Sequence, residues 1–155
     1  LKIGYIDSNE IMNNFEDVRQ VQVDLEKKQR ELENEMKDLM TQLDSLNQDY
    51  ERQRLLMSET RRLEKEKDLK RLEENIQVFQ LEKFGPEGEI YQKQNELLKP
   101  VLKDIDAAIQ NVGSERGYDF ILDAMSGALL YALDSHNLTD AVLDELNKIK
   151  KAEQK

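Results

Sequence analysis

The sequence predicts an α+β chain that is predominantly α, with a long antiparallel helical hairpin of the coiled-coil kind on a small β-containing body. Three observations lead to this fold. Apolar residues recur at every third or fourth position through most of the first half, and neither Gly nor Pro occurs between Gly4 and Gly85. Short runs of alternating apolar residues, typical of strands, occur only near the two ends. Charged residues make up 36% of the chain, which suits helices that bury one stripe.

The first predicted element is a short strand around Gly4, formed by Ile3, Tyr5 and Ile6. The Asp-Ser-Asn segment at residues 7–9 offers side-chain oxygens that can cap a helix beginning near Glu10. From Val18 onward the apolar residues form a seam with heptad spacing, and charged residues fill most other positions. The members of this seam are Val18, Val21, Leu25, Leu32, Met36, Leu39, Leu43, Leu46, Tyr50 and Met57.

A reversal of the chain is predicted near residues 58–60. The apolar rhythm loses its phase after Met57 and resumes as Leu69, Leu72, Ile76 and Phe79, which do not continue the first seam. Two antiparallel helices joined by a tight turn explain this change better than one continuous rod. A helix from about residue 22 to 58 would be ~54 Å long.

The returning helix is predicted to break at residues 85–88, where the sequence is Gly-Pro-Glu-Gly. Proline cannot extend the hydrogen-bond ladder of a helix, and glycine destabilises it. We interpret this segment as a bend or short loop that can act as a hinge. The helix should restart near Ile90, be kinked by Pro100 and end at Gly113.

The last third of the chain changes in character. Tyr118, Phe120 and Leu122 alternate as in a strand, a turn follows at Ser126-Gly127, and residues 128–133 are predicted to form a second strand. Thr139 is the predicted N-cap of a final helix. A hairpin that returns to its origin would bring the strands from both ends into one sheet. We therefore expect a body of residues 1–21 and 98–155, and an arm of residues 22–97.

No catalytic or metal-binding pattern appears in the sequence. The chain has no Cys, and His136 lies in a predicted loop without the spacing of a metal site. Asp104 and Asp106 are two residues apart on a predicted helix and face apart, so they cannot form an acid–base pair. We expect no enzyme activity, no cofactor and no metal. A net charge of −10 also argues against nucleic-acid binding, and no apolar run is long enough to span a membrane.

Several segments occur together in a recognisable order. They are residues 2–7 (Lys-Ile-Gly-Tyr-Ile-Asp), the charged heptad hairpin, residues 97–100 (Leu-Leu-Lys-Pro), residues 117–123 (Gly-Tyr-Asp-Phe-Ile-Leu-Asp), residues 130–132 (Leu-Tyr-Ala), and Leu138-Thr139 before Val142-Leu143. Over nearly its whole length this sequence resembles the Skp/OmpH family of periplasmic chaperones. The resemblance implies a jellyfish-like homotrimer in a Gram-negative periplasm, with a signal peptide already removed.

The resemblance also implies a function. The chain would be an ATP-independent holdase that binds unfolded outer-membrane proteins in a cavity between the arms and prevents their aggregation. Residues expected in the oligomeric body are Ile3, Tyr5, Ile6, Tyr118, Phe120, Leu122, Leu130 and Tyr131. Two other interpretations stay open: a structural coiled-coil adaptor that binds one specific folded partner, and a cytosolic chaperone resembling prefoldin.

Two sets of residues are candidates for contacts with other molecules. Apolar residues off the main seam are candidate client contacts: Met40, Leu55, Leu56, Val78, Leu81, Phe84 and Tyr91. A basic patch surrounds the predicted turn: Arg52, Arg54, Arg61, Arg62, Lys65, Lys67, Lys70 and Arg71. Against the four acidic residues of 52–71 this gives a local charge of +4, so the remaining residues sum to −14. Members of the family are often basic, so a basic tip on an acidic frame departs from the pattern. Such a tip could contact an anionic membrane surface.

Overall fold

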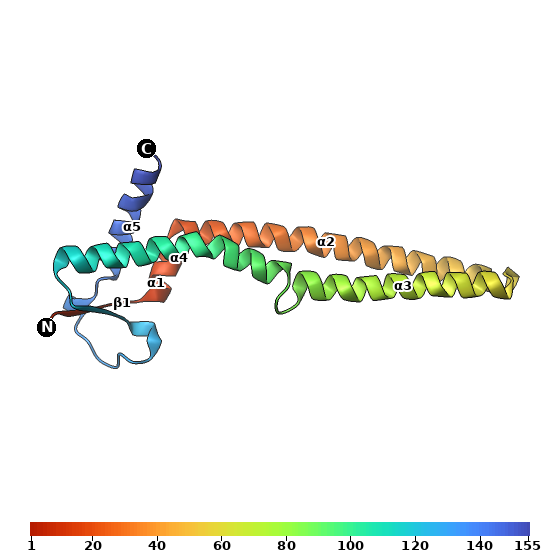
Figure 1. The fold of residues 1–155 in the computed structure, drawn as a ribbon, viewed down its shortest axis with the longest axis horizontal. Coiled ribbons are helices and arrows are strands. Elements are labelled where there is room, and N and C mark those ends of the chain that lie inside the picture. Colours follow the sequence, from red (N-terminus) through yellow and green to blue (C-terminus); the bar gives the residue numbers. More distant parts are fainter. The chain divides into compact units, whose positions relative to one another are not determined.

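The structure is a computed structural model that describes all 155 residues. Its elements are β1 (Ile3–Ile6), α1 (Ser8–Asn14), α2 (Glu16–Gln53), a 3-10 turn (Arg54–Leu56), α3 (Glu59–Phe84), α4 (Glu89–Arg116), β2 (Phe120–Asp123), 3-10 turns at Ala124–Ser126 and Asp134–His136, and α5 (Thr139–Glu153). The chain divides into two compact units (Figure 1). We call residues 1–23 and 96–155 the terminal unit, and residues 24–95 the hairpin unit.

The terminal unit contains a two-stranded parallel sheet that joins the two ends of the sequence. β1 pairs with β2 in a register that sets Ile3 opposite Phe120 and Ile6 opposite Asp123. The pairing is extended at one end, where the N–H of Asp119 donates to the carbonyl of Lys2 at 2.8 Å. The predicted fold class is therefore confirmed, with a long helical hairpin and a small sheet.

Almost all fully buried side chains belong to the terminal unit. Apart from Leu32 and Tyr50, the buried apolar residues come from β1, α1, the first turns of α2, the second half of α4, and α5 with the residue before it: Ile6, Ile11, Phe15, Val18, Val21, Val101, Ile105, Ala108, Val112, Leu138, Val142 and Leu146. Burial of apolar area is the main stabilising term in folding. The terminal unit therefore holds the hydrophobic core of the chain.

The structure confirms one of the two predicted helix caps and corrects the other. The carboxylate of Asp7 accepts the N–H of Glu10 at 3.1 Å, as an N-cap does. Thr139, however, is the first residue of α5 and not its cap. Its buried hydroxyl accepts the N–H of Asp7 at 3.0 Å and contacts the side-chain oxygen of Asn137 at 2.6 Å. A long-range bond to Asp7, the residue after β1, thus uses a hydroxyl that the local sequence pattern assigns to helix capping.

The first predicted helix is interrupted at Phe15, which the sequence did not indicate. α1 ends at Asn14, Phe15 is extended (φ −95°, ψ 116°), and α2 begins at Glu16. The ring of Phe15 is buried. Because packing of one aromatic ring in a core outweighs the loss of a few helical hydrogen bonds, the chain breaks where that ring must turn inward.

The predicted end of the returning helix at Gly113 is wrong, since α4 continues to Arg116. Gly117 follows with φ +68°, a conformation that favours glycine. The N–H of Tyr118 donates to the carbonyl of Gly113 at 2.9 Å, and that of Gly117 donates to Ser114 at 3.4 Å. This pair of bonds is the Schellman motif that closes many helices. α4 also runs through Pro100 without interruption.

The predicted second strand at residues 128–133 is also wrong, because this segment has no regular structure. The alternation of apolar residues is present, but a strand needs a neighbour, and the sheet contains only β1 and β2. The two faces of β2 differ in exposure. Phe120 and Leu122 point outward and are exposed, whereas Ile121 lies against Gly113 of α4.

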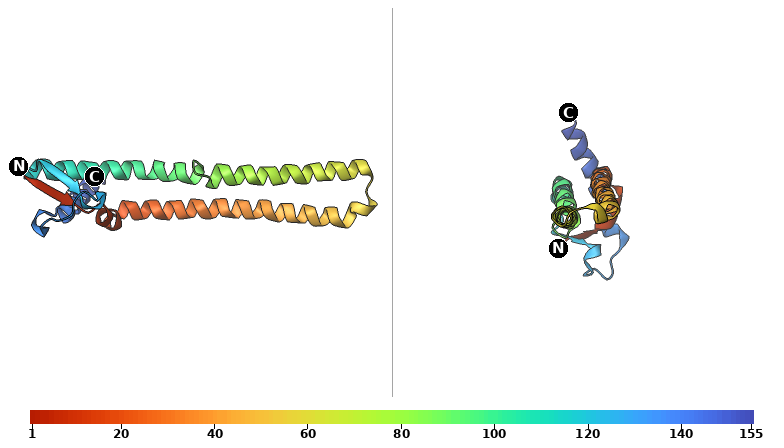
Figure 2. Two further views of the ribbon diagram at one scale, coloured as in Figure 1. Left: turned by 90° about the horizontal axis from the view of Figure 1, so that it is seen from below. Right: turned by 90° about the vertical axis from the view of Figure 1, so that its right-hand side faces the viewer.

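The hairpin unit follows the predicted seam. α2 and α3 lie side by side and are joined by a turn at residues 54–58 (Figure 2), just before the predicted residues. Among the members of the first seam in this unit, Leu32 and Tyr50 are buried and Leu46 is exposed. All the others are half-buried. The Tyr50 hydroxyl donates to the carboxylate of Glu66 across the two helices. This contact raises the pKa of Tyr50 through its hydrogen bond to Glu66.

Candidate functional site

The predicted client contacts all lie on the surface of the hairpin unit. Each of them is exposed: Met40, Leu55, Leu56, Val78, Leu81, Phe84 and Tyr91. Two further exposed apolar residues of this unit, Leu46 of the first seam and Leu63, were not among them, and neither was the exposed Val23 of the terminal unit. Leu63 belongs to α3, whose apolar residues follow no single stripe, so the heptad pattern gave no means of assigning it to a face.

The structure brings Met40 and Phe84 together. They line a groove of about 450 Å³ with Met36 and Ile76 of the two seams, and Glu33 and Gln80 complete its lining. Met40 is on α2 and Phe84 is the last residue of α3, so the groove spans the two helices. Methionine side chains adapt to irregular partners because they are unbranched and flexible. The other five candidates do not line this groove.

The basic residues lie around the turn and along the first half of α3. Arg52 and Arg54 make loose, exposed ion pairs with carboxylates one turn earlier on α2, each at 3.8 Å. Lys65 lines a pocket of about 260 Å³ with Tyr50 and Leu69. The remaining basic residues face solvent or are half-buried: Arg61, Arg62, Lys67, Lys70 and Arg71.

The predicted break between α3 and α4 is confirmed, and it is a tightly bonded turn. The N–H of Gly85 donates to Leu81, and that of Gly88 donates to Gly85 at 2.9 Å. A Cβ at Gly85 would collide with the carbonyl oxygen of Leu81, and one at Gly88 would lie 2.9 Å from the carbonyl of Glu82. Both glycines are therefore required by the close approach of the backbone.

An ion-pair clamp spans the same turn. Glu89, the first residue of α4, accepts from Lys83 of α3 at 2.5 Å and pairs with Lys28 of α2 at 3.0 Å. Hydrogen bonds from Lys83 and then Lys28 lower the pKa of Glu89, and the same contacts raise the pKa of each lysine. A single carboxylate thus ties three helices together at the break.

We expect Glu89→Gln to loosen this turn. A carboxylate whose pKa is lowered by folding stabilises the folded form above its unfolded pKa of about 4.3, and that stabilisation is lost as the pH falls through its folded value. Spin labels at the exposed Gln77 and Gln94 should show a broader distance distribution in Glu89→Gln at pH 7. The distance distribution of the wild type should broaden only when the pH is lowered below about 4. Glu87→Gln, in the same turn, is the matched control; equal distributions in all three proteins would contradict the clamp.

The predicted body residues are divided between the core and the surface of the terminal unit. Ile6 is buried in the core of its own chain, and Tyr5 and Tyr118 are half-buried. The others are exposed, and we call this set the exposed apolar face: Ile3, Phe120, Leu122, Leu130 and Tyr131. Leu130 and Tyr131 are 94% and 82% exposed. A pocket of about 430 Å³ on this face is lined by Ile3, Tyr131 and neighbouring apolar residues.

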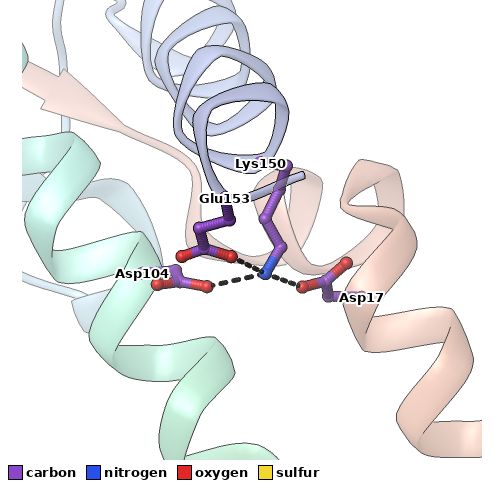
Figure 3. Close-up of polar contacts among 4 residues, drawn as sticks. All are labelled: Asp17, Asp104, Lys150 and Glu153. Atoms are coloured by element: carbon purple, nitrogen blue, oxygen red, sulfur yellow. Dashed lines mark hydrogen bonds and ion pairs between the residues drawn. The ribbon is translucent and has the colours of Figure 1, made fainter. Parts of the chain in front are cut away.

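A second ion-pair cluster lies in the terminal unit and was not expected from the sequence. The ammonium group of Lys150 on α5 contacts Asp17 of α2 at 2.6 Å, Asp104 of α4 at 3.0 Å and Glu153 at 2.9 Å (Figure 3). The hydrogen bonds to Asp17 and Glu153 are the main causes that raise the pKa of Lys150 well above its usual value. Its partners on α4 and α2 are 46 and 133 residues away in sequence, beyond the reach of any local pattern.

Comparison with known proteins places this chain in a family. A family model described as outer membrane protein (OmpH-like) matches residues 2–146. The chain belongs to the OmpH-like family. Chaperone protein Skp of Yersinia enterocolitica is 28% identical to it over 122 residues, which cover 76% of this chain and 73% of Skp. A solved structure from Caulobacter crescentus, described as an OmpH-like outer membrane chaperone, has a TM-score of 0.84 at 16% identity. The superposition covers 96% of this chain and 85% of the Caulobacter chain, and the two chains have the same fold.

The predicted family is therefore confirmed, and membership of the OmpH-like family supports a chaperone role. The structure contains no group of three or more His, Cys, Asp or Glu side chains arranged to hold a metal ion. No helix is long and apolar enough to cross a membrane. We take as the candidate site the groove and the exposed apolar residues of the hairpin unit.

Proposed function

We propose that this OmpH-like chain is a holdase that binds unfolded outer-membrane proteins without ATP or catalysis and keeps them from aggregating in the periplasm. The observation that carries the proposal is the groove of Met36, Met40, Ile76 and Phe84, which lies on a unit that also exposes several single apolar residues among its charged ones. Exposed apolar groups of this kind on a protein surface commonly mark sites of interaction. Family membership supports the same role.

Many weak contacts suit such a client better than one tight site. An unfolded chain presents apolar segments in no fixed order, so each exposed residue of the hairpin unit would bind a different segment with low affinity. Simultaneous contacts raise the overall affinity without fixing the conformation of the client. The two flexible methionines of the groove accept side chains of different shape.

The proposal includes an assembly. Residues 1–21 and 98–155 are the oligomerisation domain of a homotrimer, and residues 22–97 are the arm that contacts clients, with the cavity between three arms. The exposed apolar face around Leu130 and Tyr131 supports this division, because monomeric proteins seldom leave such residues uncovered. A two-stranded sheet is also only marginally stable alone, and pooling strands between subunits would enlarge it.

Replacing Met40 and Phe84 by Gln together should weaken the protection of an unfolded outer-membrane protein. Loss of two apolar contacts is expected to raise the chaperone concentration needed for half-protection roughly tenfold. The measurement is light scattering during dilution of the client from urea. Val23→Gln with Leu63→Gln, two exposed apolar residues outside the groove, is the matched comparison and should raise that concentration clearly less than the groove variant does.

Three results would reject the proposal in different ways. If the two double variants protect the client equally well, the groove does not bind clients. Binding of one folded partner at fixed stoichiometry, with no protection of unrelated barrel proteins, would favour the adaptor. Recovery of the native protein from the cytosolic fraction of its cell, and not from the periplasm, would reject the proposed compartment.

A further inference from the structure

Two of the five methionines of this chain have exposed side chains. Met40 on α2 is 57% exposed, and Met125, in the 3-10 turn after β2, is 48% exposed. The other three are half-buried: Met12, Met36 and Met57. Dissolved oxidants convert the thioether of methionine to a sulfoxide, and they must reach the sulfur from solvent to do so. Met40 and Met125 are therefore the two methionines most open to such a reagent.

The sulfurs of these two residues have different surroundings. The side-chain amide of Asn9 donates a hydrogen bond to the sulfur of Met125 at 3.1 Å. Among the five methionines, Met125 has the one sulfur that accepts a side-chain hydrogen bond. Oxidation begins when a lone pair of the sulfur attacks the oxidant, and a donor bound to that sulfur makes the lone pair less available. At similar exposure, Met40 thus has the more reactive sulfur.

Met40 is also the exposed methionine of the apolar groove. It lines the groove with Met36, one turn earlier on the same face of α2, and with Ile76 and Phe84 of α3. Met125 belongs to the terminal unit and does not line the groove. A chemical change at Met40 therefore alters the groove, whereas the same change at Met125 leaves it intact.

We propose that Met40 is a redox-sensitive modification site: a peroxide oxidises it to the sulfoxide ahead of the other methionines, and the oxidised groove holds clients more weakly. This switch rests on the holdase function proposed above and adds a means of control to it. Its two requirements, a reactive sulfur and a place in the groove, are met together at Met40.

The reaction is an oxygen transfer to sulfur. A lone pair of the Met40 sulfur attacks one oxygen of hydrogen peroxide, so that an S–O bond forms and the O–O bond breaks. The second oxygen leaves as hydroxide and becomes water by taking the proton of the transferred oxygen. The sulfur is oxidised by two electrons and the peroxide is reduced. Methionine sulfoxide reductases reverse the change.

The sulfoxide weakens the groove because it turns a flexible apolar side chain into a polar one. The side chains of Met36, Ile76 and Phe84 offer no hydrogen-bond donor to the new oxygen. An apolar client segment that covers this oxygen removes it from water without replacing the lost hydrogen bonds, which opposes binding. We expect the chaperone concentration needed for half-protection to rise roughly three- to tenfold.

The order of oxidation can be measured residue by residue. Lys or Arg separates each methionine from the next, and trypsin places Met36 in residues 31–37 and Met40 in residues 38–52. Mass spectrometry of the full-length chain after increasing times in hydrogen peroxide therefore gives a rate for each. Met40 should be oxidised several-fold faster than Met36, and faster than Met125. Asn9→Ala frees the sulfur of Met125 and should raise its rate toward that of Met40.

The effect on holding is tested with leucine variants. Met40→Leu keeps an apolar side chain of similar size that peroxide does not oxidise, and Met125→Leu is the matched control. Untreated, both should protect an unfolded outer-membrane protein like the wild type in the light-scattering assay. After treatment stopped before Met36 reacts, the wild type and Met125→Leu should lose protection, and Met40→Leu should keep it. Incubation with methionine sulfoxide reductases for both sulfoxide epimers should restore the wild type.

Each outcome decides between the switch and its alternatives. Preferential oxidation of Met40, with a loss of protection that Met40→Leu escapes, supports the proposal. Equal oxidation rates at Met40 and Met125, or the same loss in Met40→Leu as in the wild type, overturns it. If the untreated wild type protects the client and still does so once Met40 is fully oxidised, the switch is overturned and the holdase stands. If the untreated wild type gives no protection, the holdase is overturned, and the switch with it.

Discussion

Leu130→Asp combined with Tyr131→Asp is expected to convert an assembled protein into monomers of 18.2 kDa. These two side chains are the most exposed apolar groups of the face that we assign to the oligomer. Burying a side chain of this size contributes about 1.5–3 kcal/mol, and each chain of a symmetric assembly repeats the contact. A carboxylate at the same place would have to lose its water without a partner, which costs several kcal/mol more. Multi-angle light scattering at micromolar concentration measures the mass.

The matched control is Leu63→Asp combined with Val78→Asp, two exposed apolar residues of α3. It introduces the same charge on the hairpin unit and should leave the assembly intact. A wild type that is already monomeric, with native-like circular dichroism, would contradict the proposed oligomer. An assembled Asp double variant would place the interface elsewhere on the terminal unit.

Lys150→Met is expected to destabilise the terminal unit by about 1–3 kcal/mol. The lysine side chain is only 28% exposed, and its ammonium group is shared by carboxylates of α2, α4 and α5. Without it, Asp17 and Asp104 stay partly buried near Glu153 with no counter-charge, and they repel one another. In thermal unfolding followed by circular dichroism, this corresponds to a midpoint lower by roughly 3–10 °C. Because folding raises the pKa of Lys150, its contribution persists below its unfolded pKa and is lost only in strongly alkaline solution.

Two further variants separate the charge effect from the loss of packing. Lys151→Met alters an exposed lysine of the same helix turn and should change the midpoint by less than about 1 °C. Adding Asp17→Asn and Asp104→Asn to Lys150→Met removes the repulsion and should restore part of the lost stability. If the triple variant is no more stable than Lys150→Met, the effect comes from the packing of the methylene chain and not from charge.

The hairpin was predictable because its information is local. A seam with heptad spacing, the loss of phase after Met57 and the Gly-Pro-Glu-Gly segment each act within a few residues, and the structure has the turn at residues 54–58 and the break after Phe84. The exposure of Met40 and Phe84 follows from the same periodicity. Their meeting in one groove with Met36 and Ile76 does not, because it depends on the relative register of two helices.

Three of the errors have a common physical origin in contacts between distant residues, whereas the helix end at Arg116 is set by local bonds. Residues 128–133 alternate like a strand, yet no neighbouring strand pairs with them. Thr139 has the side chain of an N-cap, but its hydroxyl bonds to Asp7, 132 residues earlier. Phe15 breaks a helix because its ring belongs to a core assembled from both ends of the chain. Residues 128–133 lack the distant partner that a strand needs, whereas Thr139 and Phe15 have distant partners that override the local preference.

By itself, the sequence determined the class of this protein and the elements of its hairpin, since helical periodicity, breakers and charge are properties of short segments. Only the tertiary structure decided which carboxylates share Lys150, how Glu89 ties three helices at a turn, and which apolar residues remain outside the core. The reason is that burial and ion pairing depend on distances in space. Residues such as Lys2 and Asp119 become neighbours only once the hairpin has brought the two ends of the chain together.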